Sequence, residues 1–216
     1  MGKIKLTKPV LIMMYGFPGS GKTYFARQLS GSLKAVHVSS DRIRGELFET
    51  PRFDKEENQA VDHLTEYMVE EFLGAGVSVI YDMNVPTSKQ RRRLRELAQK
   101  MHAKPILLWF QVDHDTAFGR TMKRDKRRID DKYARTFDRT GFDAYITGMQ
   151  NPKREEDFLV LSGKHSFPMQ RSSLVRRLYD LNLIDAESTT SNVTKPGMVN
   201  LVPNRADLTR RNIRIR

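Results

Sequence analysis

Apolar residues in this chain fall into short, nearly uncharged runs, separated by longer stretches with apolar residues at helical spacing. The runs occupy residues 10–15, 35–38, 77–82, 106–112 and 158–161. Runs this short and continuous are typical of strands that are buried on both faces of a sheet. The chain is therefore expected to contain five strands with helical segments between them.

The stretches between the runs show the periodicity of amphipathic helices. Helices are expected at residues 22–33, 86–101, 116–126 and 170–183. A further, acidic stretch at 46–71 carries Val61, Leu64, Met68 and Phe72 on one helical face, and its acidic side chains are expected on the solvated face. Strands that alternate with helices predict an α/β fold with a doubly wound, mostly parallel sheet flanked by helices.

The turn after the first predicted strand is rich in glycine. It reads Gly16-Phe17-Pro18-Gly19-Ser20-Gly21-Lys22-Thr23 and fits the G-x-x-x-x-G-K-[ST] pattern. Glycine lets backbone N–H groups come close to phosphate oxygens, and the following helix adds its N-terminal amides and the positive end of its dipole. Lys22 would reach the β- and γ-phosphates, and the Thr23 hydroxyl would hold Mg²⁺.

This turn predicts a P-loop NTPase fold that binds a nucleoside triphosphate, with Mg²⁺ as the metal cofactor. Lys22 is also expected to act in catalysis. The residues expected to bind the nucleotide are Gly16, Pro18, Gly19, Ser20, Gly21, Lys22, Thr23, Tyr24 and, from a later helix, Arg120.

Three aspartates, Asp41, Asp82 and Asp113, follow predicted strands, so they are expected at the carboxyl edge, where α/β sheets bind ligands. Asp82 is a candidate magnesium carboxylate, although a residue at this position could instead cap a helix. Asp41 is a candidate general base that accepts the proton of an attacking hydroxyl, with helix capping as the alternative. Arg42 and Arg44, one and three positions further on, could hold an anionic acceptor.

A basic run follows the start of the helix predicted at 116–126. A phosphoryl-transfer transition state spreads negative charge over several oxygens, and arginine can stabilise that charge. Arg120 and Arg124 are four residues apart on one helical face, so both could point at the triphosphate, with Arg124 as the catalytic one. A solvated basic face is the alternative. The run comprises Arg120, Lys123, Arg124, Lys126, Arg127 and Arg128.

Residues 16–23, 39–44 and 79–84 together resemble the small P-loop kinases grouped with polynucleotide 5′-hydroxyl kinase, zeta toxins and gluconate-kinase-like enzymes, often described as AAA-like predicted kinases. The resemblance covers about residues 8–150. It implies ATP-dependent phosphorylation of a hydroxyl. The acceptors of this group range from sugars to nucleic-acid ends.

The same resemblance implies roles for individual residues. Asp41 corresponds to the general base of the group, and Arg44 to an arginine that contacts the acceptor. Asp82 and Asn84 correspond to its Asp-x-Asn, which makes Asn84 a substrate-binding candidate. The arginines at 120–128 correspond to those of a mobile lid. His165 lies beyond the shared core and is either a substrate contact or a surface histidine.

Charge is unevenly distributed along the 216 residues, whose formal net charge is +12. The length fits one kinase domain at 1–185, followed by a linker and basic C-terminal tail at 186–216. Basic stretches at 89–95, 120–139 and 205–216 favour a polyanionic partner such as nucleic acid.

Several features point to a cytoplasmic protein with no membrane partner. The chain lacks cysteine, and no apolar stretch approaches the roughly 18 residues of a membrane span. Its basic N-terminus lacks the apolar region of a signal peptide.

The favoured interpretation is a kinase that phosphorylates a nucleic-acid or nucleotide hydroxyl. One alternative is a small-molecule or sugar-nucleotide kinase of the zeta-toxin type. Another is a nucleotide-gated nucleic-acid-binding protein with little transferase activity. The sequence leaves the oligomeric state open.

Overall fold

A computed structural model of the protein describes residues 3–128 and 131–184. The predicted linker and basic tail at 186–216 lie outside the described residues. Five strands form one sheet in the order β2-β3-β1-β4-β5, and every neighbouring pair is parallel. This sheet confirms the predicted α/β fold. The strands are β1 (Val10–Tyr15), β2 (Val36–Ser39), β3 (Val79–Asn84), β4 (Lys104–Gln111) and β5 (Phe158–Ser162).

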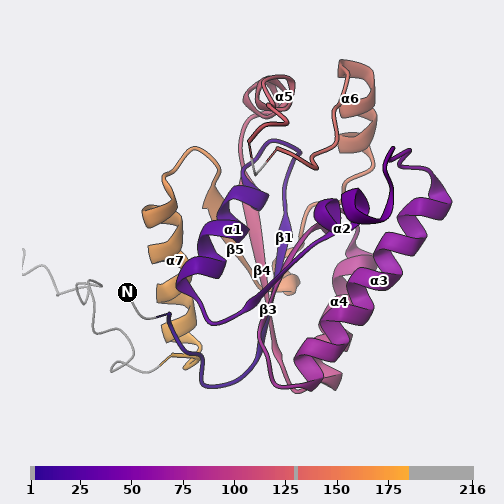
Figure 1. The fold of residues 1–216 in the computed structure, drawn as a ribbon. Helices are drawn as coiled ribbons and strands as arrows, with labels where there is room; N and C mark the ends of the chain where they lie inside the picture. The colour runs from indigo at the N-terminus through magenta and orange to yellow at the C-terminus, as the bar shows by residue number, and fades with distance from the viewer. Residues whose placement is uncertain (1–2, 129–130, 185–216) are drawn as a thin grey trace, which may run out of the picture.

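Helices cover both faces of the sheet (Figure 1). The side chains of Ile12 and its alternate neighbours in β1 pack with α1 (Lys22–Ser32) and α7 (Phe167–Asp180) on one face. Those of Met13 and its alternate neighbours pack on the other face with α3 (Lys55–Gly74) and α4 (Ser88–Lys100). Because β1 is buried on both faces, it reads in the sequence as one continuous apolar run.

Three shorter helices lie near the carboxyl ends of the strands (Figure 1). They are α2 (Ser40–Leu47), α5 (His114–Met122) and α6 (Arg139–Thr147), and a single 3₁₀ turn, η1 (Arg154–Glu156), precedes β5. The sequence pattern did not predict α6. Its buried residue is Phe142, whose ring packs against the rings of Phe118 and Phe137.

The structure rules out the helix-capping alternatives for Asp41 and Asp82. Ser39, rather than Asp41, is the N-cap of α2, and its side chain accepts from the N–H of Arg42. Asp82 lies within β3 and caps no helix.

The acidic stretch also differs from expectation. The buried stripe of α3 consists of Glu57, Val61, Thr65, Val69 and Leu73, whereas Leu64, Met68 and Phe72 are only partly buried. Glu57 is 3% exposed, because its carboxylate pairs with the Arg44 guanidinium of α2. The prediction of a wholly solvated acidic face was therefore wrong at Glu57.

A second buried ion pair joins α4 to the turn before β5. The Arg91 side chain is fully buried, and its Nε lies 2.7 Å from Oε2 of Glu156. Arg95 reaches the same oxygen at 2.8 Å. Two members of the basic stretch at 89–95 are thus structural. In the part of the chain that the structure describes, no helix has the length and apolar character needed to cross a membrane.

Candidate active site

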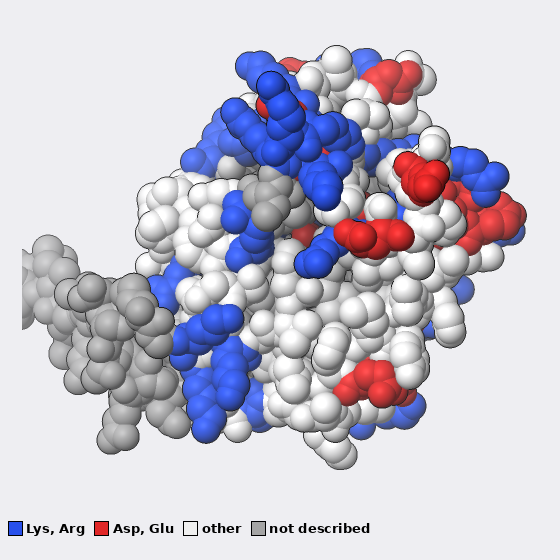
Figure 2. Space-filling model, viewed as in Figure 1, with Lys and Arg blue, Asp and Glu red and all other residues white. Residues whose placement is uncertain are grey.

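A cavity of about 750 Å³ opens at the carboxyl edge of the sheet. The P-loop forms one wall, the start of α2 and the first half of α3 form another, and the segment that follows α5 covers it. Lys and Arg side chains gather at the top of the molecule, over α5 and the chain that follows it (Figure 2). The cavity therefore lies where ligands of parallel α/β sheets bind.

The P-loop backbone requires glycine where it approaches α5. Gly19 has a φ of 83°, and a Cβ atom built on it would lie 2.3 Å from the carbonyl oxygen of Ala117. Gly21 is the N-cap of α1, so the first amides of this helix receive no capping side chain, and its first turn holds no acidic residue. Such a helix start is suited to an anion.

Lys22 is held against the loop itself. Its Nζ donates to the carbonyl oxygens of Gly16 and Phe17, each at 2.8 Å, and to Oγ of Ser20 at 3.4 Å. Burial lowers the pKa of Lys22 to about 7. The negative charges of Asp82 and Asp41 oppose this fall, and an incoming triphosphate would add to them.

Three side chains from neighbouring strands and α1 form a hydrogen-bonded chain. Oγ1 of Thr23 donates to Oδ1 of Asp82 at 3.1 Å, and Nε2 of His37 lies 3.0 Å from Oδ2 of the same carboxylate. The sequence interpretation missed His37. Its only signal was its place in a strand that pairs in parallel with the strand of Asp82.

The oxygen atoms of Thr23 and Asp82 fit Mg²⁺, which prefers oxygen ligands and usually binds one or two protein groups together with phosphates and water. The described residues contain no group of three or more His, Asp or Glu side chains that could hold a metal.

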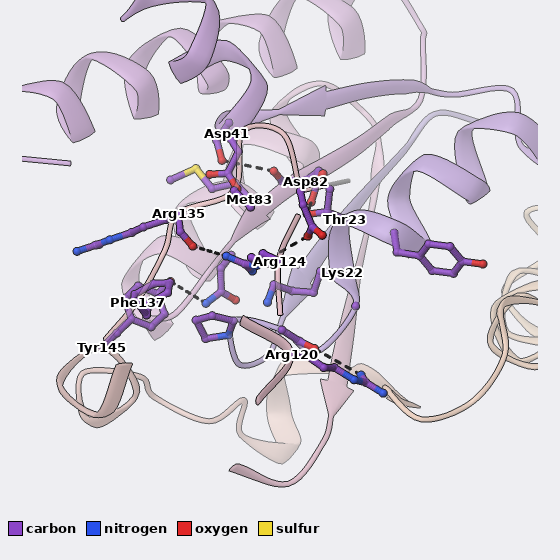
Figure 3. Close-up of a pocket in the computed structure, with 18 of the residues that line it drawn as sticks. Lys22, Thr23, Asp41, Asp82, Met83, Arg120, Arg124, Arg135, Phe137 and Tyr145 are labelled. Carbon is purple, nitrogen blue, oxygen red and sulfur yellow. Dashed lines mark hydrogen bonds and ion pairs between the residues drawn. The ribbon is translucent and has the colours of Figure 1, made fainter. Parts of the chain in front are cut away.

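Asp41 lies in the first turn of α2 and lines the same cavity. Burial raises its pKa to about 6, and the Asp82 carboxylate adds to the rise. The positive charges of Arg124 and Lys22 lie close enough to oppose it. Figure 3 shows these four side chains around one part of the cavity.

The two arginines predicted to meet the triphosphate both line the cavity. Arg120, in the last turn of α5, donates to the carbonyl oxygens of Gly163 at 2.9 Å and of Gly19 at 3.4 Å. Arg124 lies just beyond α5, with 17% of its side chain exposed, and donates to the carbonyl oxygen of Arg135.

The rest of the basic run divides between the cavity and the surface. Lys123 and Arg128 also line the cavity. Lys126 and Arg127 do not line it. Lys126 donates to the carbonyl oxygen of Ala134, and Arg127 pairs with Asp125.

The loop after β5, which the sequence left unassigned, forms part of the cavity through Gly163, Lys164 and His165. A Cβ atom on Gly163 would lie 2.5 Å from the carbonyl oxygen of Ser20, so this loop packs directly on the P-loop. Nζ of Lys164 lies 2.6 Å from Oδ2 of Asp113, and its hydrogen bond holds the pKa of Asp113 well below the usual range.

The predicted acceptor-binding residues lie in different environments. Arg42 is exposed and does not line the cavity. Arg44 lines it, but its guanidinium donates to Glu57 and, at 2.8 Å, to Asn58. Asn84 lines it as well, and its amide accepts from the N–H of Gly16 at 3.2 Å and donates to the hydroxyl of Tyr145 at 2.9 Å.

Among the predicted nucleotide-binding residues, the structure brings six P-loop positions and Arg120 to the cavity. Gly16 and Ser20 are not in its lining, since Ser20 is fully buried and Gly16 borders a smaller pocket of about 140 Å³ on the other side of the loop. The six are Pro18, Gly19, Gly21, Lys22, Thr23 and Tyr24.

Residues 11–146 match a protein family described as an AAA domain. A candidate kinase from Chloroflexus aurantiacus has a similar structure (TM-score 0.64, 15% identity, 80% of this chain and 97% of that chain covered). Kti12 from Chaetomium thermophilum, in complex with ADP-AlF3, is similar as well (TM-score 0.60, 20% identity, 79% and 97% covered). So is the APS kinase CysC from Mycobacterium tuberculosis, in complex with AMPPNP and APS (TM-score 0.57, 16% identity, 80% and 98% covered). At these identities the likeness concerns the fold. A search of curated proteins found no match.

Proposed function

This chain belongs to the AAA domain family, and we propose that it is a kinase that transfers the γ-phosphoryl group of ATP to a hydroxyl. One observation supports this most strongly. Asp41 stands in the same cavity as Lys22 and Thr23 but comes from a different element, so an acceptor between them would meet a base on one side and a phosphate on the other.

In this proposal the P-loop amides and the start of α1 hold the phosphates, and Lys22 leaves its carbonyl partners to bind the β- and γ-phosphates. Arg120 and the loop at Gly163 border the nucleotide on the side away from Asp41. The solved structures of Kti12 with ADP-AlF3 and of APS kinase with AMPPNP support nucleotide binding by this fold.

Transfer would proceed by attack of the acceptor oxygen on the γ-phosphorus. A new O–P bond forms, the bond between the γ-phosphorus and the β,γ-bridging oxygen breaks, and ADP leaves. Asp41 accepts the hydroxyl proton, and Arg124 stabilises charge on the transferring group. Mg²⁺ held by Thr23 and Asp82 would neutralise phosphate charge when bound.

Two classes of acceptor compete. The positively charged rim over α5 supports a nucleic-acid hydroxyl, because it would contact backbone phosphates. The residues that line the cavity itself instead favour a small-molecule acceptor.

The proposal is tested by incubating the full chain with γ-labelled ATP, Mg²⁺ and a panel of hydroxyl compounds. Label should pass to an acceptor, and Lys22→Ala should weaken nucleotide binding and abolish transfer while thermal unfolding stays cooperative. Asp41→Asn should keep ATP binding and reduce transfer by about 10²–10⁴-fold. Asp180→Asn, at an exposed position at the end of α7, is the matched control. ATP that binds without transfer, and without any effect of Asp41→Asn, would favour the nucleotide-gated binding protein.

A further inference from the structure

The part of the cavity beyond Asp41 has its own walls, distinct from those around the P-loop. We call it the acceptor half, and the inference drawn from it rests on the proposed kinase function. Its walls come from α2, α3, the start of α4, the segment after α5, and α6. The side chains that matter here are Arg44, Phe53, Asp62, Gln90, Arg135 and Tyr145.

The acceptor half is roofed by residues 131–137, which are fastened to α2. The Tyr133 hydroxyl donates to Oε1 of Glu46 at 2.8 Å. A Cβ atom on Gly45 would lie only 2.1 Å from the Tyr133 ring, so the ring rests on the α2 backbone. Arg135, in the same segment, lies over the Phe53 ring, 5.0 Å from its centroid. Because residues 131–137 are held in place through Tyr133 and Arg135, they limit the size of an acceptor.

Two aromatic rings of this half, those of Phe53 and Phe137, already contact arginine. The Arg44 guanidinium lies 4.7 Å from the centroid of the Phe53 ring, and Arg135 lies over the same ring and 4.9 Å from the centroid of Phe137. Single-stranded nucleic acids gain affinity by stacking bases on free aromatic faces. A base that stacked on the Phe53 ring would therefore compete with two guanidinium groups already in contact with it.

The polar groups of this half include both free acceptors and free donors. Among the described residues Asp62 has no hydrogen bond or ion pair, and its Oδ1 is buried. Burial raises the pKa of Asp62, and the positive charges of Arg44 and Arg93 offset only part of that rise. Within the part of the chain that the structure describes, the Gln90 amide forms hydrogen bonds only through its oxygen, which accepts from Thr87. Nε of Arg44 is buried and lacks a partner in the described part of the chain.

These groups suit one chemistry better than others. A hydroxyl both donates and accepts, so it can satisfy Asp62 together with Gln90 or Arg44. An ammonium only donates and would leave the donors unpaired. An anion would face the carboxylates of Asp41 and Asp62. Of the two guanidinium groups in this half, that of Arg44 is balanced by Glu57, and that of Arg135 lies over the Phe53 and Phe137 rings.

We propose that the acceptor is a small, uncharged polyhydroxy compound, one hydroxyl of which is phosphorylated at Asp41 while another is bound by Asp62 and Gln90. Asp62 then determines specificity and takes no part in the chemistry.

The experiment measures transfer from γ-labelled ATP by the full chain to sorbitol, myo-inositol, glucose, ribose, gluconate, glucosamine and a 12-nucleotide oligonucleotide with a 5′-hydroxyl. The highest kcat/KM is expected for an uncharged polyol or sugar. Gluconate, glucosamine and the oligonucleotide should be poorer by about tenfold or more.

Asp62→Asn then tests the specificity residue. It should raise the KM for the preferred polyol by about 10- to 100-fold with a smaller change in kcat, because a hydrogen bond to a charged group is lost. The variant should also unfold at the same or a higher temperature, since a buried, unpaired charge is removed. Glu56→Gln removes an exposed carboxylate from the same helix and should leave both constants unchanged.

Each other outcome overturns the inference. The inference is wrong if the oligonucleotide, gluconate or glucosamine is the preferred acceptor. It is also wrong if the KM for the polyol is unchanged in Asp62→Asn. If no member of the panel is labelled but Asp41-dependent ATP turnover persists, only the acceptor class is wrong. If ATP is neither bound nor turned over, the proposed kinase function fails as well.

Discussion

The Thr23 hydroxyl donates a hydrogen bond to the Asp82 carboxylate, with 3.1 Å between Oγ1 and Oδ1. Thr23 lies in the first turn of α1 and Asp82 lies in β3, so the contact depends on β1 and β3 being neighbours in the sheet. The other oxygen of Asp82 is occupied by His37, which fixes the orientation of the carboxylate.

His37→Ala should therefore raise the Mg²⁺ concentration needed for half-maximal phosphoryl transfer by about 10-fold or more, because residues that orient metal ligands have effects of this size. A titration of transfer rate against Mg²⁺ measures it. His63→Ala, at an exposed position on α3, is the control. An identical Mg²⁺ dependence in His37→Ala and the parent would mean that His37 does not position Asp82.

The pH dependence of kcat/KM for ATP should follow Asp41 on its acid side. Burial raises the pKa of Asp41 to about 6, so the carboxylate is protonated, and cannot act as a base, at lower pH. The rate constant is expected to rise with pH up to about 6. On the alkaline side it should fall above about 7, where Lys22 loses its proton.

Two variants distinguish the acid limb of the pH profile, assigned to Asp41, from the alkaline limb, assigned to Lys22. Lys22→Arg keeps its charge and should remove the alkaline fall, even if its absolute activity is lower. Asp41→Asn should remove the acid limb from whatever activity remains. An acid limb that persists in Asp41→Asn would assign it to another group.

Gly163→Ala tests the contact between the loop after β5 and the P-loop. The new methyl group would meet the carbonyl oxygen of Ser20 at 2.5 Å, and because that atom is backbone, one of the two loops must move. We expect weaker ATP binding, measured by calorimetry. Gly31→Ala has nothing within 4 Å of its new Cβ and should bind ATP normally, with helix stability raised by about 0.5–1 kcal/mol. Equal ATP affinity in Gly163→Ala and the parent would contradict the prediction.

Glu156 is expected to govern acid stability. The hydrogen bond from Arg91 lowers the pKa of Glu156 to about 2, from 4.5 for the free side chain. Its contribution to the free energy of unfolding is therefore complete above pH 4.5 and is lost as the pH falls toward 2. Thermal unfolding temperatures measured across this window should fall.

Glu156→Gln should lower the free energy of unfolding at pH 7 by about 3–5 kcal/mol, because it leaves the buried Arg91 without a charge partner. It should also reduce the fall between pH 4.5 and 2. Glu96→Gln breaks an exposed pair with Arg92 and should have an effect of at most about 1 kcal/mol. Equal losses in the two variants would show that burial of Arg91 is unimportant.

Local patterns predicted the sheet and the phosphate turn well. The predicted bounds of the strand at 10–15 and of the helix that starts at Lys22 agree with the structure to within one residue. Burial on both faces produces a continuous apolar run, and the phosphate turn produces a glycine-rich pattern, so both can be recognised in the sequence. The sequence signal for the helix α6 is weaker. It contains Gly141 and β-branched residues, and it depends on burial of Phe142 and on the Asp138 cap, which the pattern alone does not weigh.

The buried charges could not be predicted for a different reason. Arg91 and Glu156 are 65 residues apart in sequence, so nothing local distinguishes Arg91 from the solvated basic residues beside it. The same holds for Glu57 within an acidic stretch. Only the folded chain shows which charges are paired, and that Asp62 has no ion pair among residues 3–128 and 131–184.

The buried pair between Arg44 and Glu57 also sets rules for grafting. The nucleotide half of the cavity uses the P-loop and the loop at Gly163, whereas α2 and the start of α3 belong to the acceptor half. A relative's acceptor specificity could thus be transplanted without touching the phosphate loop. The transplanted segment would have to include both Arg44 and Glu57. A junction between them would combine residues from two different proteins and could leave one buried charge without its partner.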